Sequence, residues 1–346
     1  MGLREFVAAI PKVDLNLQLT GAFVDDGLLM IARQNGVPAE TDDFAYWTDL
    51  LVNPDYQRID ELAAVAGSWV RYPEDIARVV YDIGVGLAKA GVSYAEVAVT
   101  PSEFMQNSSM SIDVFINALN DGRDRALRGW DVDMSWILCI PRDNPRVGDD
   151  VARWATSATA KSGNVVALGL IGEEDAQPVG QFKRAFATAR KKGIFTVAQA
   201  GSSMGADGLM SALEELEPYR LTETWGIHSH PDIINSLAES GTPIVVSISR
   251  ALRRGLVDDA SAYPLRTLVD NNVQVLLASG MPRLYRSSLV DEYVMAVEQC
   301  GLDLTDVVDL ARRSIQLSFL EDERKKTLLD KFDKQLEFAK LSHLDN

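Results

Sequence analysis

Polar residues that could bind or polarise a small molecule stand at the ends of several apolar segments. They comprise amides, carboxylates, a hydroxyl group and two imidazoles, namely Asn16, Gln18, Glu173, Glu174, Gln199, Ser202, His228 and His230. Amides and hydroxyls hydrogen-bond a nucleobase or a sugar and stabilise charge that develops during a reaction. Histidine titrates near neutral pH, and burial raises the pKa of a glutamate, so these residue types also support proton transfer. The pattern predicts a polar binding site with acid–base groups.

The apolar segments that carry these residues have the length of β-strands. We expect eight strands, at residues 13–19, 92–100, 133–140, 165–171, 194–198, 225–228, 243–248 and 273–278. Several are almost continuously hydrophobic, which is typical of parallel strands covered on both faces. The polar residues would therefore follow the strands at one end of a parallel sheet.

Amphipathic patterns typical of helices separate these strands. One begins at Pro73, runs to Lys89 and ends before Gly91, and others cover residues 181–192 and 232–239. Repeated strand–helix alternation predicts an α/β fold, a (β/α)8 barrel with its active site at the carboxyl ends of the strands. Residues 287–346 look helical throughout, so we expect one barrel domain over residues 1–346 with a C-terminal helical extension.

Composition narrows the class of protein and of ligand. The 346 residues include 34 basic and 50 acidic side chains, a formal charge of −16, which disfavours nucleic acid and anionic lipid as partners. No apolar run reaches the length of a membrane helix, and no signal peptide is evident. Cys139 and Cys300 have no metal-binding spacing and suggest buried thiols in a reducing compartment. We expect a cytoplasmic protein with a small-molecule ligand; its oligomeric state is open.

Sequence motifs along most of the chain resemble those of the adenosine deaminase family of the zinc amidohydrolase superfamily. Residues 11–22, PKVDLNLQLTGA, follow that family's frame P-K-x-E-L-H-x-H-L-x-G-A. Residues 72–75 (YPED) and 92–96 (VSYAE) resemble two further landmarks, and residues 263–264, 273–282 and 311–320 resemble the closing motifs. The resemblance covers residues 5–330 and implies the same barrel fold.

The resemblance also implies a zinc site, which this sequence does not reproduce. Family members hold one zinc with three histidines and an aspartate, and the metal activates the water that attacks a purine. The corresponding positions here are Asn16, Gln18, Gln199 and Gly280. Amides are poor zinc ligands and glycine supplies no side chain, so we expect no metal cofactor.

The resemblance places the family's catalytic groups at positions that are also altered. Ser202 stands where the family has its proton-donating glutamate, and Met281 replaces the second aspartate. The catalytic histidine is either lost to Ile227 or displaced to His228. We therefore expect no deamination of adenosine by the family mechanism.

Our main hypothesis is a metal-independent enzyme that acts on a purine nucleoside-like or other small polar substrate. His228, Ser202 and Gln199 are the candidate catalytic residues. The candidate substrate-binding residues are Asn16, Gln18, Gly21, Gly172, Glu173, Gly201 and Met281. The alternative for the amides is that they fill the emptied metal cavity by bonding to one another.

Two other functions remain open at the level of sequence. One is a catalytically silent pseudoenzyme that binds a ligand or an active paralogue, since Gly280 and Met281 cannot perform acid–base work. The other is a relocated metal site, in which His228 and His230 join Glu173 or Glu174. Basic residues at positions 250, 253 and 254 could meet an anionic substrate group, but we interpret them as a solvated helix face.

Overall fold

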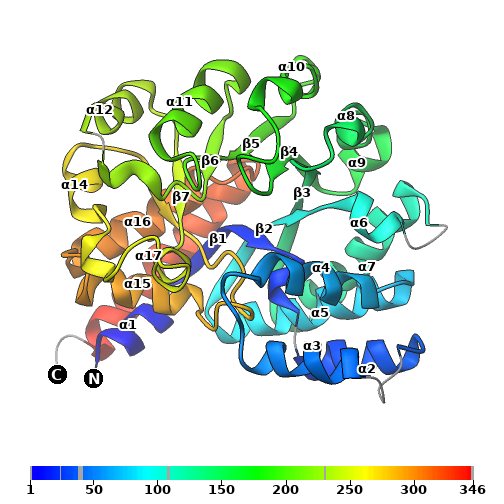
Figure 1. The fold of residues 1–346 in the computed structure, drawn as a ribbon. Helices are drawn as coiled ribbons and strands as arrows, with labels where there is room; N and C mark the ends of the chain where they lie inside the picture. Colours follow the sequence, from blue (N-terminus) through cyan, green and yellow to red (C-terminus); the bar gives the residue numbers. More distant parts are fainter. Residues whose placement is uncertain (1, 24, 38–41, 107–109, 230, 344–346) are drawn as a thin grey trace.

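The fold is a barrel of eight parallel strands surrounded by helices (Figure 1), as expected from the sequence. The computed structural model describes residues 2–23, 25–37, 42–106, 110–229 and 231–343. The strands are β1 (Lys12–Gln18), β2 (Val92–Val99), β3 (Asp133–Pro141), β4 (Val165–Ile171), β5 (Phe195–Gln199), β6 (Arg220–Thr222), β7 (Ile244–Val246) and β8 (Val275–Leu277). They are neighbours in chain order. The backbone N–H of Gln18 donates to the Gly280 carbonyl at 2.8 Å, which joins β1 to the segment that follows β8.

Helices follow the strands around the outside of the barrel (Figure 1). The first half of the chain contributes α1 (Leu3–Ala9), α2 (Asp25–Gln34), α3 (Asp42–Val52), α4 (Ile59–Trp69), α5 (Pro73–Lys89), α6 (Pro101–Met105), α7 (Ile112–Trp130), α8 (Gly148–Ala155) and α9 (Ala158–Ser162). The second half contributes α10 (Lys183–Lys191), α11 (Gly205–Leu216), α12 (Pro231–Ser240), α13 (Ile248–Arg253), α14 (Leu265–Asp270), α15 (Leu289–Glu298), α16 (Leu304–Gln316) and α17 (Asp322–His343). Helix α1 packs against α17, so the two ends of the described chain lie close together.

Helix α5 has the bounds that its sequence predicts. Pro73 starts it, the Asp75 carboxylate accepts from the Tyr72 amide at 3.0 Å, and Gly91, with φ of 69°, follows its end. Helix α5 packs closely on α7, because Gly122 of α7 has no side chain. A Cβ at Gly122 would lie 2.4 Å from the carbonyl oxygen of Ala77 on α5. The two helices cover β2 and β3 from outside.

The sixth strand lies elsewhere than expected. Residues 225–228 are not a strand: β6 covers Arg220–Thr222, and Gly226–Ser229 form a short 3-10 turn, η4. The strand pairs with β5 and β7 through only a few residues, and a charged side chain stands on each side of its apolar centre. This short, charge-flanked segment carries little of the hydrophobic signal on which strand prediction depends.

A buried ion pair closes the amino-terminal end of the barrel. Arg220, at the start of β6, donates to the Glu96 carboxylate on β2 at 2.5 Å and to the Leu15 and Leu317 carbonyls at 3.1 and 2.8 Å. The Phe319 amide donates to the same carboxylate, and its ring lies 4.0 Å from the Arg220 guanidinium carbon. These contacts anchor the segment after α16 beneath the strands.

Other expectations concern the C-terminal helices, the thiols and the membrane. The C-terminal extension is present as α15, α16 and α17. Cys139 and Cys300 are free and buried, as expected. Among the helices that the structure describes, none combines the length and the apolar character needed to cross a membrane.

Candidate functional site

A cavity of about 380 Å³ opens at the carboxyl ends of the strands. Five residues expected at the site from the sequence line it: Gln18, Gly172, Glu173, Gln199 and Met281. Its charged lining includes Arg250, which the sequence analysis assigned to a solvated helix face, and four residues that it did not single out: Asp60, Glu103, Arg142 and Asp143. Its volume falls in the range typical of small-molecule sites. We call it the mouth cavity.

The two side-chain amides that line the mouth cavity, those of Gln18 and Gln199, differ in their hydrogen bonds. The Gln199 Oε1 atom accepts from the Gly172 amide at 3.3 Å, which ties β5 to the loop after β4. Within the described part of the chain, the Gln18 side chain makes no hydrogen bond, although it lines the cavity. Gln18 therefore keeps both a donor and an acceptor for a ligand.

Asn16 lies beside a buried glutamate that sequence analysis missed. Its Nδ2 donates to Glu223 Oε1 at 3.0 Å, and Arg250 Nη1 lies 3.2 Å from the same oxygen. Glu223 is 1% exposed and Arg250 2% exposed, so the basic residue at position 250 is not part of a solvated face. We call Asn16, Glu223 and Arg250 the mouth triad.

The mouth triad is not fully satisfied. Glu223 Oε2 and the Arg250 Nε and Nη1 atoms are buried without a hydrogen-bond partner in the described structure, since the short contact between the pair is not an aligned hydrogen bond. Burial raises the pKa of Glu223, an effect that Arg250 and Asn16 oppose. Glu223 also has φ of 60°, which is unfavourable for a non-glycine residue. Strained backbone and buried polar atoms without hydrogen-bond partners are features found at functional sites.

Glu223 was missed because β6 was predicted too far along the chain. Once β6 ends at Thr222, Glu223 is the first residue after the strand, the position at which barrel enzymes place functional groups. The signal available from sequence was the acidic residue directly after the short apolar centre of Arg220–Thr222.

Glu103 is a second acid that sequence analysis missed. It lies on α6, after β2, lines the mouth cavity and has an exposed side chain. Desolvation by the surrounding protein, together with the charges of Asp143 and Asp60, raises its pKa to about 7. A carboxyl group of this kind exchanges protons near neutral pH.

Ser202 and Gly201 belong to a loop that Glu174 organises. The Glu174 carboxylate accepts from the Gly201 amide at 2.8 Å, from Ser202 Oγ at 3.0 Å and from the Met204 amide at 3.1 Å. Glu174 is buried, so these bonds fix the start of the β5–α11 connection. Neither Ser202 nor Gly201 is among the residues that line the mouth cavity.

Gly21 lies in the 3-10 turn η1 (Thr20–Ala22) and supports Met281. A Cβ at Gly21 would lie 2.2 Å from Met281 Cγ, so only glycine allows Met281 to pack there and form the cavity wall.

The structure describes only part of one candidate histidine, His228, and none of the other, His230. The backbone of His228 lies in η4, several residues beyond the end of β6, and its side chain lies outside what the structure describes. His230 also lies outside the described residues. Among described residues, no group of three or more His, Cys, Asp or Glu side chains has the arrangement of a metal site.

Comparisons with known proteins agree with the geometry of the barrel. The adenosine deaminase family matches residues 11–335. Aminodeoxyfutalosine deaminase of Streptomyces coelicolor is 25% identical over 96% of this chain and 86% of its own length. Adenine deaminase of Rhizobium leguminosarum bv. trifolii is 28% identical over 92% and 98%.

A solved structure gives the same result for the fold. Arabidopsis ADAL complexed with IMP superposes with a TM-score of 0.85 at 19% identity, covering 97% of this chain and 99% of its own. The family match spans nearly the whole sequence. This chain therefore belongs to the adenosine deaminase family.

Proposed function

We propose that this protein binds a purine-like or other small polar ligand in the mouth cavity and acts on it by acid–base chemistry without a bound zinc. The observation that carries the proposal is the mouth triad, in which a buried glutamate is held by an amide and an arginine. A guanidinium is a permanent cation and needs no metal to remain charged. It gives the site a fixed positive charge beside its polar lining.

The side chains present do not fit zinc. Asn16 presents its amide NH₂ to Glu223, and the Gln199 oxygen accepts from the backbone of Gly172. Gly280 offers no ligand, and a Cβ there would lie 3.7 Å from Glu223 Oε1. Zinc sites use imidazole, thiolate or carboxylate groups, with about three protein ligands in a catalytic site. The Glu223 carboxylate instead lies against this part of the site and is paired with Arg250.

The ligand class is inferred from the lining and from the relatives. Purine edges carry both hydrogen-bond donors and acceptors, which an amide such as that of Gln18 can meet at once. The two curated relatives are named for deamination of adenine and of aminodeoxyfutalosine, and ADAL was solved with IMP. A purine base, nucleoside or nucleotide is therefore the first ligand class to test.

Glu103 is the best-placed proton carrier in this proposal and takes the role that we expected of His228. It lines the mouth cavity from α6, and Gln199 lines the same cavity from β5. Its pKa of about 7 leaves it able both to donate and to accept a proton at neutral pH. Gln18 and Gln199 would orient the ligand, while Arg250 would stabilise negative charge that develops on it.

The binding experiment uses isothermal titration with adenine, adenosine and IMP on protein dialysed against a chelator and checked by elemental analysis. We expect binding of at least one purine by the metal-free protein. Gln18→Ala should weaken that binding about fivefold, because a hydrogen bond lost from a ligand costs about 1 kcal/mol. Gln316→Ala, at an exposed position on α16, is the matched control and should change nothing. Binding that appears only when zinc is restored would overturn the proposal.

The catalytic part of the proposal is tested separately. Any ligand found by titration is incubated with the metal-free protein, and products are followed by chromatography across pH 5 to 9. Glu103→Gln should abolish turnover but preserve binding, whereas Glu321→Gln on the surface should preserve both. Binding without turnover in the unmodified protein would favour the catalytically silent alternative.

A further inference from the structure

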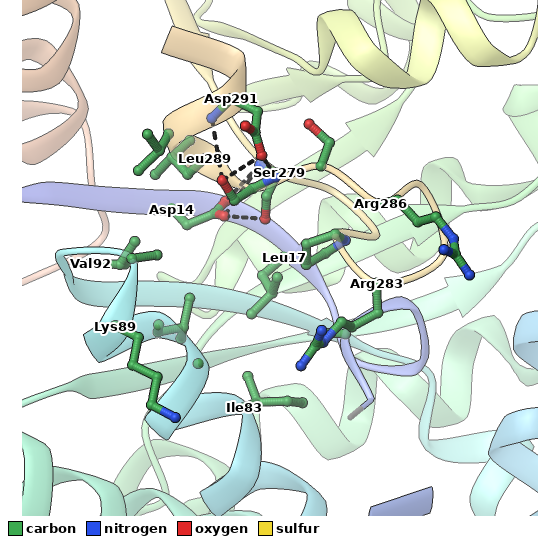
Figure 2. A pocket seen from close by; sticks show the side chains of 18 of the residues that line it. Asp14, Leu17, Ile83, Lys89, Val92, Ser279, Arg283, Arg286, Leu289 and Asp291 are labelled. Carbon is green, nitrogen blue, oxygen red and sulfur yellow. Dashed lines mark hydrogen bonds between the residues drawn. The ribbon is translucent and has the colours of Figure 1, made fainter. Parts of the chain in front are cut away.

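A second cavity lies outside the strands, away from the mouth cavity. It measures about 690 Å³ and lies over β1, between α5 and the segment that leads from β8 into α15 (Figure 2). The N-terminal helix α1 contributes Arg4 and Ala8 to its edge. We call it the side cavity. Its volume exceeds that of the mouth cavity, and nothing in the proposed function uses it.

The deep part of the side cavity is mostly apolar. Leu17 of β1, Ile83 and Leu87 of α5, and Leu289 of α15 face it. Asp14 also reaches it, but that carboxylate is satisfied, because Ser279 donates to it from both its amide and its hydroxyl group. Figure 2 shows these two residues bonded together at one end of the cavity. An apolar body can therefore enter without leaving Asp14 unpaired.

Cations lie on two sides of the apolar part. Lys89 lies at the end of α5, and Arg283 and Arg286 lie on the opposite side, in the segment after β8, with the Arg286 side chain directed away from Leu17 and Ile83 (Figure 2). Within the described residues, Lys89 and Arg283 make no side-chain hydrogen bond or ion pair, and Arg286 bonds only to the carbonyls of Leu51 and Val52. All three side chains are exposed.

The acids at this cavity do not neutralise those cations. Asp291 is paired with Arg4, and Asp82 with Arg78. Asp25 makes no ion pair in the described structure; desolvation raises its pKa, and the charges of Arg283 and Arg286 oppose that shift. Lys89 and Arg283 therefore keep side-chain nitrogens free for an anion at this cavity, on a chain whose net charge is −16.

We propose that the side cavity binds a small organic anion, with its apolar body against Leu17, Ile83 and Leu87 and its anionic group between Lys89 and Arg283. Arginine and lysine on either side of an opening suit a carboxylate or a phosphate. Apolar walls with a few convergent charged groups are the usual construction of a small-molecule site. The proposal goes beyond the proposed function and does not depend on it.

The first test uses 8-anilinonaphthalene-1-sulfonate, a fluorescent organic anion, as the probe. We expect saturable binding that octanoate and octyl phosphate displace and that octanol, which has the same apolar body without charge, does not. Comparing the two anions shows whether a carboxylate or a phosphate head is preferred. Displacement by octanol as effective as that by octanoate would overturn the proposal.

Variants locate the binding within the molecule. Lys89→Ala combined with Arg283→Ala should raise the probe's Kd at least tenfold. The matched control is Arg146→Ala combined with Lys161→Ala, two exposed cations near other helices, and it should leave the Kd unchanged. Equal Kd values in the two double variants would place the probe elsewhere and contradict the proposal.

A steric variant tests the same site without changing its charge. Gly86 lines the cavity on α5, and a Cβ there would meet no atom within 4 Å, so Gly86→Leu places a side chain in open space. We expect Gly86→Leu to abolish the displaceable probe signal. Gly129→Leu on α7 is equally unobstructed and remote from the cavity, so it should bind normally. Normal binding by Gly86→Leu would overturn the proposed position.

Discussion

The two ends of the barrel each bury a glutamate–arginine pair, and the two pairs are built differently. Arg220 is the first residue of β6 and Glu223 is the first residue after it, yet one lies at the amino-terminal end and the other at the mouth. Arg220 pairs with Glu96 of β2, whereas Glu223 pairs with Arg250 of α13. Four consecutive residues therefore supply one member of each pair.

The amino-terminal pair is satisfied by several partners. Glu96 accepts from Arg220 and from the Phe319 amide, and Arg220 also donates to two carbonyls. Burial raises the pKa of Glu96, and Arg220 opposes that shift. A buried ion pair contributes to stability only when further hydrogen bonds satisfy its atoms, and here most of them are satisfied. Its position agrees with the structural role typical of this end of a barrel.

The mouth pair has open hydrogen-bonding capacity. Both arginines have an unpartnered Nε in the described structure, but in the mouth pair Glu223 Oε2 and Arg250 Nη1 also lack a hydrogen-bond partner, and the Glu223 backbone is strained. A pair built for stability alone would be expected to satisfy such atoms. Charge and burial are therefore the same at the two ends, whereas the number of satisfied hydrogen-bonding atoms differs, and only the mouth pair has a member, Arg250, that lines the mouth cavity.

The largest effect is expected from breaking the amino-terminal pair. Glu96→Ala leaves Arg220 charged and fully buried, so the free energy of unfolding should fall by about 3–5 kcal/mol. Urea unfolding followed by circular dichroism measures the change. A loss below about 1 kcal/mol would show that this pair is not the structural member of the comparison.

A pH effect of up to about 3 kcal/mol is expected from Glu292, which supports the mouth. Its carboxylate accepts from the Ile248 amide at 2.6 Å and from Ser287 Oγ at 3.1 Å, and so fixes the start of the helix that carries Arg250. Burial raises the pKa of Glu292 from 4.5 to about 7, although these hydrogen bonds oppose the shift. Between those values the native state holds a proton that the unfolded chain releases. This contribution to stability is therefore full below about pH 4.5 and is lost as the pH rises through 7.

The Glu292 prediction is checked by urea unfolding at a series of pH values. Glu292→Gln removes the titrating group, so its unfolding free energy should depend less on pH between 4.5 and 7 than that of the unmodified protein. Parallel pH profiles for the two proteins would contradict the assignment.

A smaller loss of stability, about 1–3 kcal/mol, is expected for Glu223→Ala. Arg250 would lose its acid but keep its contacts over the rings of Trp225 and Tyr285 and its position on the mouth cavity, where water can reach it. Binding of the purine found by titration should weaken in this variant and remain normal in any folded Glu96 variant. The two ends would not differ as argued if both variants lost equal stability and equal binding.

Local sequence patterns predicted most elements of the fold. Strand β4 and helix α5 have the predicted bounds, because a continuous apolar run and a proline-to-glycine amphipathic segment are local signals. Strand β6 was misplaced because its burial depends on partners far along the chain: Glu96 is 124 residues from Arg220. Short strands with charged ends are stabilised by tertiary contacts, which sequence periodicity does not contain.

The same limit applies to the candidate site. Gln18, Gln199 and Met281 were placed at the mouth from the ends of long, well-predicted strands or from the motif that follows them, and they do meet in one cavity. The sequence analysis did not place Glu223 at the mouth, because it expected the sixth strand at residues 225–228 and not at Arg220–Thr222. Glu103 lies on a short helix, and its chemistry arises from neighbours on other loops, so neither acid had a local signal.

The smallest change in the free energy of unfolding is expected from two glycine substitutions. Together they distinguish the effect of backbone strain from the effect of contact with the site. Gly280 at the mouth and Gly193 before β5 both have positive φ, 63° and 75°. Alanine at either position should cost about 1 kcal/mol of unfolding free energy, since a Cβ is disfavoured in this conformation. Only at Gly280 would the new methyl group approach Glu223 Oε1, at 3.7 Å, whereas a Cβ at Gly193 meets nothing within 4 Å. Purine affinity measured by titration should therefore fall in Gly280→Ala alone; an equal fall in Gly193→Ala would mean that general loss of stability, and not the mouth triad, governs binding.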